Sequence, residues 1–145
     1  MSINYTTQLD GKYQKVASAY GQTLISLMFL MKTTTLYRPV NQLELDRIAA
    51  SGWIAFPRRL AEQPFFYPVL NEEYATQITR RWNVPYYGVG YVTQFAVKTE
   101  YLKQFAVQNV GDKIHDELWV PAEELAEFNC HIVGVIEVIG EYRAE

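Results

Sequence analysis

The sequence predicts an α+β domain, with helices packed on a mixed or antiparallel sheet. In the first half, segments of helical periodicity alternate with short apolar strands, and after Gly88 segments with apolar residues at every second position dominate. An apolar share of 49% in 145 residues is enough for one hydrophobic core. Because no internal repeat or linker divides the chain, we expect a single α+β domain.

The first half predicts two strands that are each followed by a helix. Short apolar segments predict the strands, at residues 36–40 and 65–70, and a short extended piece at 53–57. Helical periodicity predicts the helices, at residues 42–51 and 72–82. Asn41 and Asn71 suit the two N-caps, Gly52 suits the end of the first helix, and Pro68 favours a sheet edge or a bulge. Residues 83–88 are expected to form a turn.

The second half predicts four strands, at residues 90–97, 105–110, 113–120 and 131–142. One helical turn is expected at 99–102, and a second helix after Pro121, which suits a first helical turn. Gly134 and Gly140 indicate bulges in the last strand. Five residues should lie in or near the core: Tyr37, Phe66, Phe95, Leu118 and Ile136.

Residues 1–35 differ from the rest, and we expect the domain to cover 36–145. An apolar run at residues 24–31 is too short to span a bilayer, and Lys12 and Lys15 precede it. Three interpretations stay open: a helix packed on the domain, a signal peptide, and a misplaced start codon with Met31 as the natural first residue.

Charge and cysteine content limit the classes of partner. The net charge is -3 and no basic run occurs, so we expect no nucleic acid as a main partner. With Cys130 alone no intrachain disulfide forms, which fits a reducing compartment, and we expect a cytoplasmic protein that does not bind a membrane. Two distant histidines and one cysteine give no metal-site spacing, so no metal is expected. The 11 tyrosines favour a wide, partly hydrated pocket or interface.

The segment 113–129 carries the most informative polar pattern. In an extended chain His115, Glu117 and Trp119 project to one side. Two interpretations stay open: a solvated face of a sheet, and the floor of a cleft. Motifs elsewhere in the chain are needed to distinguish these two interpretations.

Several short motifs, read together, resemble the ADP-ribosyltransferase fold. They are Leu36-Tyr37-Arg38 with Ala50-Ser51-Gly52, Phe66-Tyr67 before Asn71-Glu72-Glu73-Tyr74-Ala75, and His115-Asp116-Glu117-Leu118-Trp119-Val120-Pro121. Residues 36–142 are similar to short bacterial proteins with an ADP-ribosylation/crystallin label. The Ser-Thr-Ser motif of the family is replaced by Tyr67-Pro68-Val69, and His115 stands where relatives have an acid or Gln. The all-helical ADP-ribosyl glycohydrolases do not fit the predicted strands.

The resemblance implies an NAD-dependent enzyme of the glycosyltransferase class that cleaves the nicotinamide–ribose bond, with NAD as substrate. Glu117 and His115 would be the catalytic residues: Glu117 would hold a ribose hydroxyl and stabilise the oxocarbenium ion, with His115 beside it. Arg38 would bind the diphosphate, and Tyr67 or Trp119 would pack on the nicotinamide. The acceptor stays open, and a protein is one option.

The alternative is a non-catalytic binding module that keeps the fold and the nucleotide cleft. The absent Ser-Thr-Ser motif favours this module, whereas the joint presence of Arg38 and Glu117 favours the enzyme. Their side chains should converge on one cleft in the enzyme. A guanidinium and a carboxylate on opposite faces would leave a binding or structural role.

Overall fold

The computed structural model describes Gly21 and residues 31–145. The chain divides into two units, and the second, Thr33–Glu145, contains the elements discussed below. The interpretations of residues 1–30, as a packed helix, a signal peptide or a misplaced start, lie outside the described residues apart from Gly21. Within the described part of the chain, no helix has both the length and the apolar character needed to cross a membrane.

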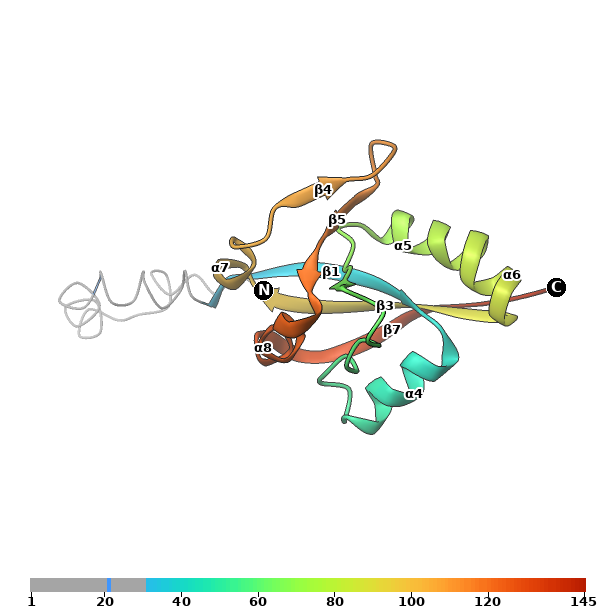
Figure 1. Ribbon diagram of the computed structural model, residues 1–145, viewed down its shortest axis with the longest axis horizontal. Helices are drawn as coiled ribbons and strands as arrows, with labels where there is room; N and C mark the ends of the chain where they lie inside the picture. The colour runs from blue at the N-terminus through green and yellow to red at the C-terminus, as the bar shows by residue number, and fades with distance from the viewer. Residues whose placement is uncertain (1–20, 22–30) are drawn as a thin grey trace, which may run out of the picture. The chain divides into compact units, whose positions relative to one another are not determined.

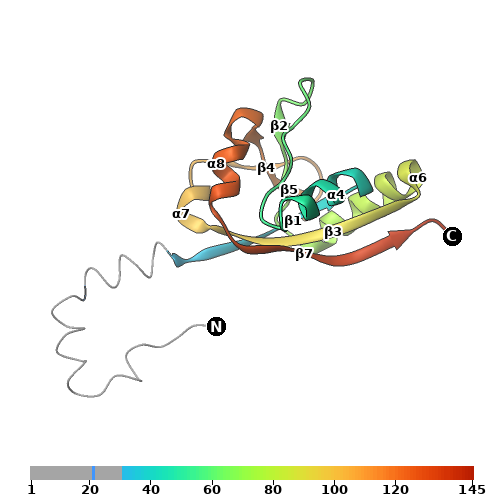
Figure 2. The same ribbon diagram turned by 90° about the horizontal axis from the view of Figure 1, so that it is seen from below.

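An antiparallel sheet of three strands forms the centre of the domain (Figure 1). Its order is β1 (Thr33–Val40), β3 (Val89–Lys98) and β7 (Ile132–Arg143), and Figure 2 shows β3 and β7 side by side. The three strands match the apolar segments predicted at 36–40, 90–97 and 131–142, so the α+β class is confirmed. The pairing of β3 with β7 shifts register twice, and Gly134 has φ +78°, which confirms bulges in the last strand.

A second set of strands continues the sheet beyond β1. Val69 forms bridges to Tyr37 of β1 and to Glu117 of β5 (Asp116–Leu118), which pairs with β4 (Val107–Asn109). Nearby, β2 (Phe65–Phe66) pairs with β6 (Val120–Pro121). The strand expected at 65–70 is therefore interrupted at Pro68, because proline has no N–H to donate to a neighbouring strand.

The helices begin at the predicted caps. The Asn41 side chain accepts from the N–H of Glu44 at the start of α4 (Gln42–Ala50), and Gly52 follows with φ +81°. Asn71 caps α5 (Glu72–Ile78) in the same way. Shorter helices follow later: α7 (Thr99–Leu102), the 3-10 turn η2 (Ala122–Glu124) and α8 (Leu125–Cys130).

Two local predictions are wrong. The turn expected at 83–88 is helical, because α5 continues through a π-helix, η1 (Thr79–Asn83), into α6 (Val84–Tyr87) before Gly88 ends it with φ +83°. Proline lacks the N–H of the regular ladder, and the wider π turn directly before Pro85 accommodates it. The extended piece expected at 53–57 contains no strand, and Trp53 has φ 66°.

Two apolar clusters lie on opposite faces of the sheet. Residues of α4 and α8, including Ile48 and Phe128, join Leu36 of β1 in the larger cluster. Ala75 of α5 joins Val69 and Val92 in the smaller one, and Figure 1 shows α4 and α5 on opposite sides of the strands. The core prediction is confirmed for four buried residues, Phe66, Phe95, Leu118 and Ile136. Tyr37 is half-buried and packs against the smaller cluster.

Candidate functional site

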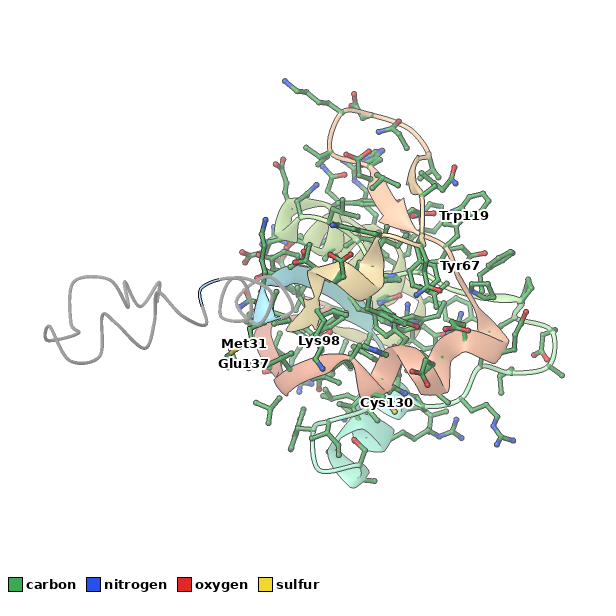
Figure 3. The ribbon with its side chains drawn as sticks, turned by 90° about the vertical axis from the view of Figure 1, so that its left-hand side faces the viewer. Met31, Tyr67, Lys98, Trp119, Cys130 and Glu137 are labelled. Carbon is green, nitrogen blue, oxygen red and sulfur yellow. The ribbon has the colours of Figure 1, made fainter. Side chains whose placement is uncertain are left out.

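Three aromatic side chains form a wall next to the end of β5. Phe65 and Tyr67 project to the same side because they are two residues apart, and the pairing of β2 with β6 brings Trp119 to them. The ring centroids are 5.8 Å apart for Phe65 and Trp119 and 6.1 Å apart for Tyr67 and Trp119. Figure 3 labels Tyr67 and Trp119 at this position. Trp119 is 40% exposed, so this wall offers an indole face to a ligand.

The carboxylate of Glu117 is held by one donor on each oxygen. The indole Nε1 of Trp119 donates to Oε1 at 2.8 Å, and the hydroxyl of Tyr74 donates to Oε2 at 3.0 Å. Hydrogen bonds to an ionised acceptor are short and strong, so they fix the carboxylate plane. A carboxylate has about four lone-pair positions, so capacity remains for hydroxyl groups of a ligand.

Tyr74 stays protonated under ordinary conditions. Burial, followed by the hydrogen bond to Glu117 and its charge, raises the pKa of Tyr74 to about 12. At neutral pH the phenol is therefore a permanent donor to Glu117. Its ring packs against the imidazole of His115, with ring centroids 4.6 Å apart.

His115 is held in place by two hydrogen bonds. Its Nδ1 lies 2.9 Å from the backbone N of Asp112, which donates, so Nδ1 acts as acceptor. Nε2 lies 3.0 Å from Oε1 of Gln77 and, carrying the proton, donates to it. Both ring nitrogens of His115 therefore have hydrogen-bond partners within the domain, and the ring packs against Tyr74.

Arg38 lies on the other face of the sheet. Tyr37, Val69 and Glu117 are direct partners across neighbouring antiparallel segments, so their side chains project from one face. Arg38 follows Tyr37 in β1 and projects from the opposite face. The arrangement expected of an enzyme, with guanidinium and carboxylate converging on one cleft, is not formed.

The guanidinium of Arg38 is occupied by partners within the domain. Its Nε and one terminal nitrogen donate to the carboxylate of Glu44, at 3.0 and 2.8 Å. The other terminal nitrogen lies 3.4 Å from the carbonyl oxygen of Tyr67, and the group packs over the Phe66 ring at 4.6 Å. Arg38 is 9% exposed, so its partners and burial describe a structural ion pair.

The structure therefore separates the five candidate residues. His115, Glu117, Trp119 and Tyr67 are linked by contacts through Tyr74 and the aromatic wall, and Arg38 is not part of that network. We call the surface formed by Phe65, Tyr67, Tyr74, His115, Glu117 and Trp119 the Glu117 surface.

Tyr74 and Gln77 also belong to this network, although the sequence alone did not point to them. Both lie on α5, which is attached to the β5 region by Asn71, whose side chain donates to the Ile114 carbonyl oxygen at 2.6 Å. The cap itself was predictable, but a single sequence does not show which strand a helix packs against. The available signal was the tyrosine in the first turn of a capped helix, because the hydroxyl of Tyr74 can reach a polar partner on a neighbouring strand.

Comparisons with known proteins identify no relative of this chain. No family model, curated protein or solved structure matches the chain. Among the residues that the structure describes, no group of three or more His, Cys, Asp or Glu side chains is placed to hold a metal ion. The geometry of the Glu117 surface is therefore the basis for a functional assignment.

Proposed function

We propose that the chain is a nucleotide-binding module with an ADP-ribosyltransferase-like fold, and that the Glu117 surface holds NAD or a related nucleotide. The observation that carries the proposal is a carboxylate fixed by Tyr74 and Trp119 beside an exposed indole. Its free lone pairs suit the hydroxyls of a ribose, and the aromatic wall suits a flat base. Polar groups beside an apolar wall are the usual composition of a small-molecule site.

The position of Arg38 differs from the one expected of the enzyme. Its guanidinium group donates two hydrogen bonds to Glu44, and the side chain projects from the face opposite Glu117. It is therefore not available to neutralise a diphosphate held on the Glu117 surface. Without that cation the enzymatic assignment loses one of the two residues on which it depended.

A second candidate function, cleavage of NAD, is favoured by the fixed orientation of Glu117. When the nicotinamide–ribose bond breaks, nicotinamide leaves with the bonding electron pair and positive charge develops on the ribose. A preorganised carboxylate stabilises that charge without reorganising during the reaction. Water or a protein nucleophile would then attack the ribose and lose a proton.

Titration calorimetry with NAD, combined with a nicotinamide-release assay, tests both functions. The binding module predicts saturable NAD binding without nicotinamide release, and Glu117→Gln should weaken binding about tenfold through loss of charge-assisted hydrogen bonds. The enzyme predicts nicotinamide release that falls about 10²-fold in Glu117→Gln, with a smaller change in KM. Glu127→Gln, on the exposed surface of α8, is the matched control and should change neither quantity. Absence of NAD binding to the unaltered chain would refute NAD cleavage, and absence of binding of both NAD and ADP-ribose would refute the binding module.

A further inference from the structure

A cavity of about 280 Å³ lies where β1 ends and α4 begins, and none of the residues of the Glu117 surface lines it. We call it the arginine cavity because four arginines are among its lining residues: Arg38, Arg47, Arg58 and Arg59. Glu44 is the single acidic residue in that lining. Three positive charges are therefore in excess at one place, in a chain whose net charge is -3.

Two of the arginines share one carboxylate. Oε1 of Glu44 accepts from Arg38 at 2.8 Å and lies 3.9 Å from a terminal nitrogen of Arg59. Arg59 is fixed by a second bond, from Nε to the Phe65 carbonyl oxygen at 2.9 Å, and its side chain is 13% exposed. Burial and then the nearby charge of Arg38 lower the pKa of Arg59. One carboxylate thus faces two largely buried guanidinium groups, which leaves a positive charge uncompensated.

The other two arginines are exposed at the cavity. Within residues 31–145, Arg47 and Arg58 take part in none of the observed ion pairs. The Gln63 side chain also lines the cavity, and its oxygen accepts from the Leu60 N–H, so its amide N–H groups remain as donors. The cavity thus combines an uncompensated buried charge with two exposed cations and a neutral donor.

A cavity elsewhere in the domain does not share this charge excess. The cavity beside α5, of about 530 Å³, is lined by Glu72 and Glu73 together with Arg80 and Arg81. Its acidic and basic residues are equal in number. The arginine cavity is also smaller than the range of roughly 300–1,000 Å³ typical of sites for drug-sized ligands, so its volume suits a small group.

We propose that the arginine cavity binds a phosphate group, at a site separate from the Glu117 surface. A phosphate carries nearly two negative charges and several acceptor oxygens, which planar guanidinium groups match with paired hydrogen bonds. A carboxylate supplies one charge and would leave more of the excess uncompensated. The phosphate is free inorganic phosphate or the end of a monoester, whose carbon chain would contact Leu60 at the cavity.

Titrations at low ionic strength test the site, because salt screens charges at the exposed arginines. Inorganic phosphate and glycerol 3-phosphate are titrated separately into the full chain by calorimetry. We expect saturable binding of one equivalent, weakened at least tenfold in the double variant Arg47→Ala, Arg58→Ala, which removes two charge-assisted contacts. Tighter binding of glycerol 3-phosphate identifies a monoester site, and tighter binding of inorganic phosphate identifies a free-phosphate site.

Two single variants serve as controls. Arg81→Ala removes an exposed arginine from the charge-balanced cavity and should leave phosphate affinity within twofold. Glu117→Gln should leave it unchanged, so failure of the nucleotide proposal does not affect this result. Because Arg47 and Arg58 are exposed, the double variant should fold, which circular dichroism checks. Lack of saturable phosphate binding to the unaltered chain, or equal weakening by Arg81→Ala, overturns the proposal.

Discussion

Replacing Glu44 with alanine should destabilise the domain by about 3 kcal/mol, near the lower end of the cost of breaking a buried ion pair. The Glu44 side chain is 14% exposed and accepts from Arg38 at 2.8 and 3.0 Å, with Arg59 at 3.9 Å. Its removal leaves two neighbouring guanidinium groups without an anion. The lower end applies because the Arg38 and Glu44 side chains keep an exposed fraction of 11% and 14%.

Urea unfolding followed by circular dichroism measures this cost. With a slope of about 1–3 kcal/mol/M for a small domain, a loss of 3 kcal/mol lowers the midpoint by about 1–3 M. The control is Glu100→Ala, because Glu100 pairs with Lys103 at the same 2.8 Å but is 42% exposed. The control should cost less than about 1 kcal/mol. Equal costs for the two variants would show that the Arg38–Glu44 pair is not a buried structural pair.

Three further predictions concern stability. The folded state holds the Tyr74 proton more tightly than the unfolded chain does, since its pKa rises from 10.0 to about 12. This difference contributes to the free energy of unfolding in full below pH 10, and the contribution is lost as the pH rises through 12. In Tyr74→Phe the free energy of unfolding, measured with urea between pH 9 and 12, should therefore fall less with rising pH. Phe128→Ala should cost about 3–5 kcal/mol, because Phe128 is fully buried between aromatic rings, and a loss below 1 kcal/mol in urea unfolding would contradict this packing. A chain that starts at Met31 should fold and keep the ligand binding of the full chain, because the compact unit begins at Thr33, whereas insolubility or a loss above about 2 kcal/mol would contradict this.

The parts of the fold that were predictable depend on local chemistry. Asn41 and Asn71 cap helices because their side chains accept from the N–H three residues later. The many β-branched and aromatic residues of β3 and β7 favour strands. The alternation around Glu117 likewise placed His115 and Trp119 beside it.

The parts that were not predictable depend on contacts between distant segments. The bridge from Tyr37 through Val69 to Glu117 decides which side chains share a face, and no local pattern specifies that pairing. Arg38 has the same local sequence whether it binds a ligand or pairs with Glu44. Its guanidinium is covered by the Phe66 ring and the Tyr67 carbonyl, and these contacts are visible only in the folded chain.

Nitrogen-15 NMR of the indole groups, with NAD as titrant, is the most direct test of the proposed nucleotide site. The chain has three tryptophans, and their indole signals can be assigned with Trp→Phe variants. Trp119 donates to Glu117 from the centre of the Glu117 surface, whereas Trp82 is 71% exposed in η1 and serves as an internal control. We expect a saturable shift of the Trp119 signal, no comparable shift of Trp82, and loss of saturation in Glu117→Gln. An unmoved Trp119 signal at millimolar NAD, or equal shifts of both signals, would contradict nucleotide binding at Glu117.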